Sequence, residues 1–477
     1  MNIEQGQGEP ADRSGTGEAV TSGPRPVLGY FDAVALIVGI VVGAGIFSFP
    51  SLVASNSPSA WTFVLVWVLG GAISLVGALC YAELASAFPN AGGDYHFLKR
   101  AFGGRFAFLF AWARMSVIQT GSLAILAFVF GDYATQFYSL GGSSPMIYAA
   151  LVIVLLTVIN SIGIQFGAGT QKLLTSLQIL GVITIIFAGI FLAPEVPAAA
   201  AAPTTSGATA GASAFGLAMV FVLLTFGGWN EAAYISAEMR RGKRQIARSL
   251  IMGICVITVL YVLVNVAYVS ALGLGGVAAS SAVAGDTMRA TLGEGAAWII
   301  GLLVAIAALT SANATIFTGA RTNYALGRDV PALGLLGRWN DRADSPVNAL
   351  MVQGLVALGL VGLSVWTRDG ISAIIDYTAP VFWFFFLMVG VSLFVLRKKE
   401  PDAERPFRVP LYPVVPALFC VTSAYLLYSS VVYTGLGSFV GIGVLVIGAI
   451  VLYMLPAVET LADNNEYRRD EDEISAI

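Results

Sequence analysis

Charged residues are scarce in this sequence. Asp, Glu, Lys and Arg together make up 11% of the 477 residues, whereas a typical soluble domain carries roughly 25%. The formal net charge is only −3, so the chain lacks the excess of positive charge that nucleic-acid binding requires. The composition therefore argues against a large soluble domain and against a nucleic-acid partner.

Cysteine and histidine are also rare. The three cysteines, Cys80, Cys255 and Cys420, fall inside apolar runs, so we expect no disulfide framework and no metal cluster. The single histidine, His96, is predicted to lie in a solvated polar loop. The sequence has no phosphate-binding loop of the G-x-x-x-x-G-K type, which argues against ATP. No nucleophile–base pair stands at a common depth, so we expect no enzyme.

Apolar residues are abundant, at 57% of the chain. They form runs of about 20 residues, the length that crosses a bilayer as a helix. We predict an all-α polytopic membrane protein with twelve transmembrane helices. The predicted spans are 29–55, 60–87, 105–132, 146–163, 170–193, 214–239, 246–272, 297–326, 346–366, 371–396, 412–433 and 437–456.

The distribution of positive charge supports this count. With both termini in the cytoplasm, 22 of the 25 Lys and Arg residues fall on the cytoplasmic side, and only Arg289 and Arg368 fall outside. Arg114 lies within the third span. This bias follows the positive-inside rule, and one missed span would reverse every later loop. We therefore expect a multi-pass protein of the cell membrane, plasma or inner.

Two spans contain glycines near their middle, where a membrane helix should be most regular. The first reads "VVGAGIF", with Gly43 and Gly45, and the sixth reads "FVLLTFGGWNEAAYISAEM", with Gly227 and Gly228. These spans open two successive groups of five. Broken helices at matching positions are typical of transporters built from an inverted repeat, with the ligand at the breaks. The alternative is that the glycines only allow close helix packing.

The two breaks offer opposite charges to a ligand. Where helix one resumes, at residues 44–47, free N–H groups and the positive end of the dipole favour a carboxylate. Where the first part of helix six stops, at residues 224–226, free carbonyl groups favour an ammonium group. A site with both suits an α-amino acid.

Four stretches resemble the amino acid–polyamine–organocation superfamily, and within it bacterial relatives of the L-type neutral amino acid transporters. They are "VGAGIFSFPSLVA", "YAELASAFPNAGGDYHFLKRAFG", "GGWNEAAYISAEMRRGKRQIARSL" and "LTSANATIFTGARTNYALGRD". The resemblance implies a five-plus-five inverted repeat in residues 27–400 and two added helices in 401–459. Residues 1–26, which we expect to be disordered, and residues 460–477 would be cytoplasmic tails.

The resemblance also implies the residues of the substrate site. Gly43, Ala44 and Gly45 would meet the substrate carboxylate, and the backbone of Phe226, Gly227 and Gly228 would meet its amino group. Trp229 and Asn230 would lie beside the site, with Glu231 one residue further on. At the position of the aromatic gate of the L-type relatives this chain has Leu224.

An ion site is suggested by two further departures. Sodium-independent relatives place a lysine midway along helix five, where this chain has Gln178. In helix eight, Ala307, Thr310 and Ser311 match the sodium site of sodium-coupled members of the wider fold, which also uses helix-one carbonyl groups, here near Val42. The alternative is that Thr310 and Ser311 bond to their own helix. Apart from a sodium ion, no cofactor is expected.

Several acidic and basic residues are predicted inside or at the edge of the membrane, where charge is functional by default. Glu231 could read a cationic side chain, accept a proton or bond a neighbouring helix. Arg114 needs a partner, and we expect a structural ion pair. Glu83 and Glu238, near cytoplasmic ends, are predicted parts of an inner gate.

These observations favour a secondary transporter that moves an α-amino acid, predicted to be neutral, by alternating access. Coupling to Na⁺, coupling to H⁺ and exchange all stay open, as do a monomer and a homodimer. One alternative is a polyamine or cationic amine transporter, favoured if Glu231 lines the site. Another is a membrane sensor or partner-dependent subunit that does not transport; a sensor would be expected to carry a signalling domain, and none is visible.

Overall fold

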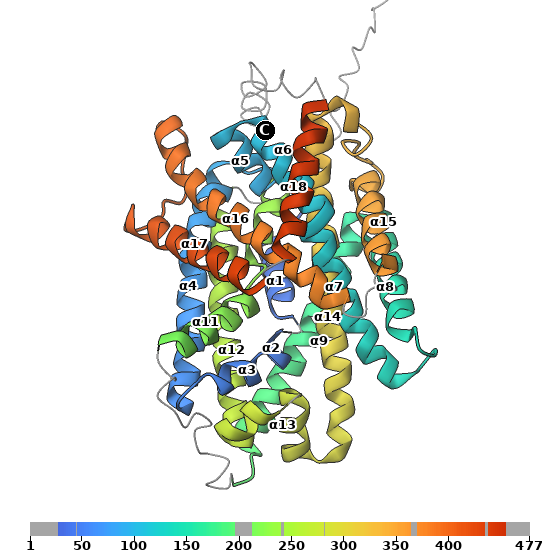
Figure 1. Cartoon of the computed structure of the whole chain (residues 1–477), viewed down its shortest axis with the longest axis vertical. Coiled ribbons are helices and arrows are strands. Elements are labelled where there is room, and N and C mark those ends of the chain that lie inside the picture. The colour runs from blue at the N-terminus through green and yellow to red at the C-terminus, as the bar shows by residue number, and fades with distance from the viewer. Residues whose placement is uncertain are drawn as a thin grey trace, which may run out of the picture.

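The computed structural model describes residues 27–43, 45–195, 212–239, 243–280, 282–363, 370–434 and 437–454. These ranges are almost entirely helical, and their only β-type pairing consists of two isolated bridges, Leu28 with Met239 and Asn340 with Ser345. Most of the longer helices run along the long axis of the molecule (Figure 1). The predicted all-α architecture is confirmed.

The first five predicted spans each coincide with helical segments. They are α1 (Tyr30–Val41) with α2 (Gly45–Ser48) and α3 (Pro50–Ser55); α4 (Ala60–Ala87); α6 (Gly104–Ala113) with the π-helical turn η1 (Arg114–Ile118) and α7 (Gln119–Phe137); α8 (Ser144–Ile162); and α9 (Ile164–Phe191). A short helix, α5 (Asp94–Phe102), lies between the second span and the third.

The second half follows the same order. Its helices are α11 (Ala212–Thr225) with η2 (Trp229–Glu238), α12 (Lys243–Ala279), α14 (Ala297–Asp329), α15 (Val347–Leu363) and α16 (Gly370–Lys399). The connecting helices are α13 (Val283–Leu292), η3 (Glu294–Ala296) and η4 (Pro331–Leu333). The last two spans are α17 (Val414–Thr434) and α18 (Gly437–Met454).

Within the described ranges, nine helical segments are long and apolar enough to cross a membrane. Three shorter apolar helices, Tyr30–Val41, Val347–Gly362 and Gly441–Met454, stand where the first, ninth and twelfth spans were predicted. A polytopic membrane protein is therefore established, while the count of twelve spans remains a prediction. Both predicted tails lie outside the described residues.

Helices at equivalent positions of the two halves pack against each other. The second spans of each half, α4 and α12, are in contact, as are the third spans, α7 and α14, and the fourth spans, α8 and α15. A two-fold axis between the halves brings equivalent helices together in this way, so the packing agrees with the predicted inverted repeat.

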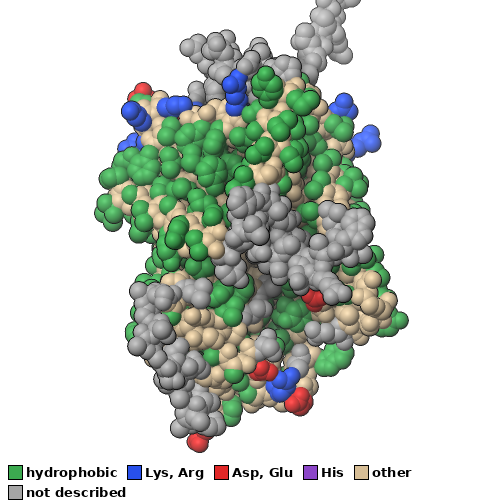
Figure 2. Space-filling model, viewed as in Figure 1, with side chains coloured by type: hydrophobic (Ala, Val, Ile, Leu, Met, Phe, Trp, Pro, Cys, Tyr) green, Lys and Arg blue, Asp and Glu red, His purple; other side chains and the backbone are tan. Residues whose placement is uncertain are grey.

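Lysine and arginine side chains gather at the end of the molecule that carries α5, while the end with α13 shows few of them (Figure 2). His96 lies at this basic end, within α5 and not in the solvated loop that we predicted. The loop prediction was wrong because Phe97 and Leu98 are buried and draw the segment onto the core as a helix. Burial, with Arg100 and Lys99 nearby, lowers the pKa of His96 to about 3.

Buried ion pairs hold the helix ends together at the basic end. Glu238 at the end of η2 pairs with Arg321 of α14, with nitrogen–oxygen distances of 2.5 and 2.8 Å. Glu83 of α4 pairs with Arg397 of α16 at 2.5 Å. The backbone N–H of Leu28 donates to the Glu238 carbonyl at 2.8 Å. Both glutamates predicted for an inner gate thus join helices of different spans at this end.

Candidate functional site

The first helix is interrupted at the predicted position. α1 ends at Val41, and the next carbonyl points away from the helix direction because Val42 has ψ of 70°. The chain is helical again from Gly45. That segment continues beyond Phe49, whose N–H donates to the Gly45 carbonyl at 2.8 Å. Ala44, predicted to meet the carboxylate, lies outside the described residues.

The sixth helix is interrupted at its glycine pair. α11 ends at Thr225, and the N–H of Gly227 closes a tight turn by donating to the Leu224 carbonyl at 3.1 Å. Gly228 has φ of +106°, a left-handed conformation that glycine adopts without strain. The chain then continues from Trp229 as η2, a 3₁₀ helix narrower than an α-helix. The predicted break is confirmed.

The two breaks lie side by side. A Cβ atom added to Gly228 would stand 2.5 Å from Cγ2 of Ile40, so glycine permits the contact between helix six and helix one. The Tyr261 hydroxyl of α12 lies 2.7 Å from the Val41 carbonyl oxygen and 3.1 Å from that of Thr225. One hydroxyl group thus lies within hydrogen-bond distance of a carbonyl oxygen at the end of each interrupted helix. Sequence reasoning missed Tyr261; a lone tyrosine in an apolar run was its only signal.

Of the predicted ion-site residues, Ser311 lies at the first break. Its hydroxyl is 3.1 Å from the carbonyl oxygens of both Gly39 and Ile40. The Thr310 hydroxyl instead donates to its own helix, at the Ile306 carbonyl, at 2.7 Å. In this conformation Thr310 therefore follows the alternative that we considered, whereas Ser311 joins its helix to the carbonyl end of α1.

The other three predicted ion-site residues are buried. Val42 and Ala307 have no exposed surface, and Gln178 of α9 is 1% exposed. Neither the amide nitrogen nor the amide oxygen of Gln178 has a hydrogen-bond partner. A buried amide without partners loses its hydration without compensation, so Gln178 is the member of this set whose polar group the described residues leave unpaired.

A pocket opens on one side of the helix-six break. Gly227, Gly228, Trp229 and Asn230 form one wall, and Leu224, which is 44% exposed, belongs to the same lining. The remaining lining residues come from α4, α11, α16 and α17 and are Ile73, Ser74, Leu223, Phe382, Trp383, Phe386, Phe419, Thr422, Ser423 and Leu426.

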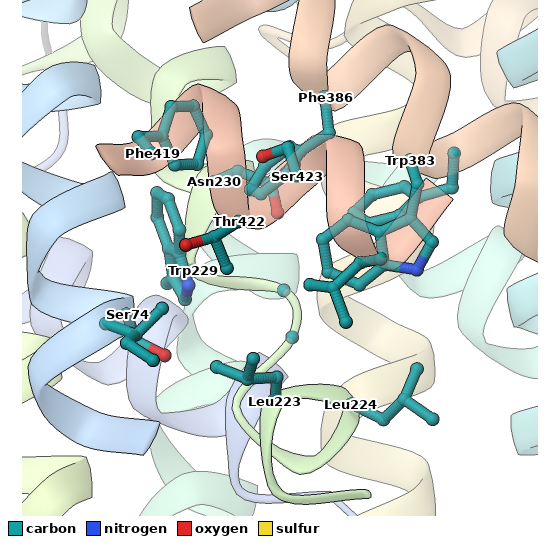
Figure 3. A pocket seen from close by; sticks show the side chains of 15 residues that line it. Ser74, Leu223, Leu224, Trp229, Asn230, Trp383, Phe386, Phe419, Thr422 and Ser423 are labelled. Atoms are coloured by element: carbon teal, nitrogen blue, oxygen red, sulfur yellow. The ribbon is translucent and has the colours of Figure 1, made fainter. Parts of the chain in front are cut away.

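The pocket wall is mostly aromatic and aliphatic. Figure 3 shows Trp229 and Phe419 on one side, Trp383 on the other, and Leu223 and Leu224 at the end of α11. Charged side chains do not line this pocket among the described residues. The walls from α16 and α17 were missed by sequence reasoning, although the run "VFWFFF" at 381–386 was a signal.

Phe226 and Trp229 point into packed aromatic clusters. The Phe226 ring has no exposed surface and packs on Tyr261 with ring centres 4.9 Å apart. Trp229 packs edge-on against Tyr81 at 5.2 Å and near Phe386 at 5.5 Å. The rings fix the course of the chain on either side of the glycine pair, so the backbone groups of the break have a defined position.

Glu231 is held by neighbouring helices. Its Oε2 atom accepts from Arg114 at 2.6 Å and from the Thr318 hydroxyl at 2.5 Å, and Gln119 lies 3.5 Å away. Arg114 is 2% exposed and Glu231 is 8% exposed. The structural ion pair predicted for Arg114 is present, and it joins the third, sixth and eighth spans. Glu231 is absent from the pocket lining.

A bundle of apolar helices with two adjacent broken helices defines a membrane transporter of the inverted-repeat class. Comparison with known families makes this specific: residues 28–456 match the amino acid permease family, and the chain belongs to it. The family lies within the superfamily whose resemblance was noted from the sequence motifs.

Characterised relatives agree with this assignment. The chain is 30% identical to human b(0,+)-type amino acid transporter 1 over 423 residues, covering 87% of this chain and 84% of that protein. It is 30% identical to mouse large neutral amino acids transporter small subunit 2 over 440 residues, covering 90% and 82%. These similarities support amino acid transport.

Replacing glycine by alanine should affect protein stability differently at the two breaks. We predict that Gly228→Ala destabilises the protein, because left-handed backbone costs roughly 1–2 kcal/mol for alanine and the new Cβ would overlap Ile40. Gly45→Ala is the matched control, because its Cβ would meet Phe49 and Thr225 at an ordinary 3.4 Å. The melting temperature of each purified variant measures this. Equal melting of both variants would contradict the account of the break.

Proposed function

We propose that this protein is a secondary transporter that moves a neutral α-amino acid across the membrane by alternating access. The observation that carries the proposal is the side-by-side placement of the two breaks. The start of the helical segment at Gly45 offers N–H groups to a carboxylate. The end of α11 at Thr225 offers carbonyl oxygens to an ammonium group, since the oxygens that already accept from Gly227 and Tyr261 can each accept a second hydrogen bond. An α-amino acid carries both groups on one carbon.

The preference for a neutral substrate rests on the side-chain environment. The pocket beside Gly227 and Gly228 is lined by aromatic and aliphatic residues, which favour an apolar side chain. Glu231, the residue that would favour an amine, is already paired with Arg114. Binding a cationic side chain there would require breaking a buried ion pair, which is costly. The amine alternative is therefore disfavoured.

We place the end that carries α5 in the cytoplasm, because lysine and arginine gather there. The buried pairs of Glu83 and Glu238 then close the cytoplasmic side. Alternating access would require these pairs to separate while contacts form at the opposite end. The protein would lie in the plasma or inner membrane with both termini cytoplasmic.

The pocket assignment is tested at Trp383. Trp383→Ala removes an indole that is 8% exposed and lines the pocket. We expect the ratio of L-tryptophan to L-alanine uptake into proteoliposomes to rise about tenfold, equivalent to about 1.4 kcal/mol of selectivity. Trp298→Ala is the matched control, since that indole is 63% exposed and lies on the outer surface of α14.

The two uptake ratios distinguish the possibilities. An unchanged ratio in Trp383→Ala would remove this pocket from the substrate path. If the unaltered protein instead took up only L-lysine or putrescine, the proposal of a neutral substrate would be wrong.

A sodium ion as coupling ion is a separate proposal. Ser311 and the α1 carbonyls of Gly39 and Ile40 would supply oxygen ligands, whereas Thr310 would have to turn its hydroxyl away from Ile306. If sodium binds here, Ser311→Ala should raise the half-saturating sodium concentration for uptake about tenfold or more, as a lost ligand worth about 1.4 kcal/mol predicts. An unchanged sodium response, or uptake that ignores sodium, would remove this site.

A further inference from the structure

Asp94 carries a buried carboxyl group at the start of α5. It is the first residue of α5, whose last turn carries Lys99 and Arg100. The side chain is turned inward, with 4% of the residue exposed. Gly93 lies against the Tyr234 ring, where a Cβ would stand 2.5 Å from a ring carbon. This close approach brings the start of α5 into the core, beside η2.

The hydrogen bonding of Asp94 is incomplete for an ionised carboxylate. Its Oδ2 accepts one bond, from the Tyr81 hydroxyl, at 3.2 Å. Its Oδ1 is buried near the buried Tyr234 hydroxyl, and the two groups interact without forming a well-aligned hydrogen bond, so the two tyrosine hydroxyls are the side-chain donors that face this carboxyl group. An ionised carboxylate accepts several bonds when it is stable in a protein interior. A protonated one needs fewer acceptor contacts and can itself donate.

The charges around Asp94 lead to the same conclusion. Arg114 is the cation nearest to this cluster, and it pairs with Glu231 at 2.6 Å. Glu231 also accepts from Thr318, so these two hydrogen-bond donors converge on Glu231 and not on Asp94. With Arg114 neutralised, a charge on Asp94 would leave the buried cluster with a net negative charge. One proton on Asp94 removes this imbalance.

The groups that face Asp94 come from several elements. They are Tyr81 on α4, Arg114 on η1, and Glu231 and Tyr234 on η2. Among the described side chains, the other charged groups on α5 and at the end of α16 pair with other residues or lie outward. Lys99 pairs with Asp329, Arg100 with Glu400, Arg397 with Glu83 and Lys399 with the Ala101 carbonyl, while Lys398 is exposed. His96 on α5 is neutral at pH 7, and Arg105 on α6 is exposed.

We propose that Asp94 is a proton-binding site of the transport cycle, protonated while the cytoplasmic side is closed and deprotonated when α5 moves away from η2. The step adds to a carboxylate oxygen one proton that arrives from the extracellular side, and it later releases this proton to cytoplasmic water, with no other bond made or broken. This proposal rests on the proposed function, and it names the proton as a coupled substrate.

The pKa of Asp94 gives the direction of the coupling. Burial, opposed by Arg114 and assisted by Glu231, raises the pKa of Asp94 to about 7 in the closed structure. In contact with water the same group would have a pKa of about 3.9. Between these two values the closed state binds more protons than the open one. A rise in pH through this window therefore favours opening, and a fall favours closure.

The first test is a pH titration of the purified protein by infrared difference spectroscopy. The unaltered protein should show a protonated carboxyl band that is lost with a midpoint near pH 7. Asp94→Asn should lack this band, and Asp94→Glu should restore a titrating carboxyl. Asp402→Asn, which changes an exposed aspartate at the same end of the molecule, should keep it. A band that persists in Asp94→Asn would overturn the proposal.

The second test follows L-leucine in proteoliposomes with the membrane potential held at zero. For one proton per substrate, a gradient of one pH unit, acid outside, drives accumulation of at most about tenfold in the unaltered protein. Asp94→Asn should accumulate none but still exchange internal for external L-leucine, and Asp94→Glu should accumulate it. Accumulation by Asp94→Asn equal to that of the unaltered protein would contradict the proposal.

The two tests separate the proton site from the proposed function. If the unaltered protein neither exchanged nor accumulated L-leucine while the Asp94 band still titrated, the proposed substrate would be wrong and the proton site would stand. If Asp94→Asn does not fold, the comparison of Asp94→Glu with the unaltered protein decides. A glutamate variant that folds but neither titrates nor accumulates L-leucine would contradict the proposal, which expects a carboxyl group at this position to restore both. A glutamate variant that folds, has the pKa of a carboxyl group in water and still accumulates L-leucine as well as the unaltered protein would refute the proposal.

Discussion

The structure depends on one constraint, which is that a backbone polar group inside a membrane must find a partner in the protein or in a water-filled cavity. Interrupting a helix removes such partners. Here the hydroxyl groups of Tyr261 and Ser311 lie within hydrogen-bond distance of the α1 carbonyls, and Tyr261 also reaches the carbonyl of Thr225. In the proposed function, the N–H groups at the start of the Gly45 segment, beside the same breaks, would take the carboxylate of the substrate.

The buried ion pairs lie in two places, at the basic end of the molecule and next to the pocket at the helix-six break. Glu83 and Glu238 each hold an arginine at the basic end, and Glu231 holds Arg114 one residue beyond the pocket wall. Removing one member of a buried pair leaves an uncompensated charge. These pairs therefore restrict which helices can separate. Asp94 differs because its neighbouring cation, Arg114, is already paired with Glu231, which is why we propose that the charge of Asp94 changes during transport.

The positions of the helix breaks could be predicted from the sequence, whereas the partners of the buried side chains could not. The pairs Gly43 with Gly45 and Gly227 with Gly228 marked the breaks because glycine is unfavourable in a helix interior. The apolar runs located the spans, and the bias of Lys and Arg supported their number because each loop takes one side of the membrane. Both signals depend only on position along the chain, which a sequence states directly.

The partner of a side chain depends on the angle at which two helices meet. That angle cannot be predicted from the spacing of residues along the chain. The need of Arg114 for a counter-ion was predictable, but the choice of Glu231 over Glu238 was not. Thr310 and Ser311 are adjacent, yet one hydroxyl bonds its own helix and the other reaches α1. His96 was misplaced for the same reason, because the burial of α5 is decided by the helices around it.

The most direct test of the central claim is the thermal stability of the purified protein with each of the twenty amino acids and with polyamines. A ligand that binds only the native state raises its apparent stability, by about 2.7 kcal/mol at a concentration one hundred times the dissociation constant. The account predicts stabilisation by neutral L-amino acids, and none by the matching amines that lack a carboxylate. Stabilisation by amines alone would contradict a site built from one carboxylate-binding and one ammonium-binding helix end.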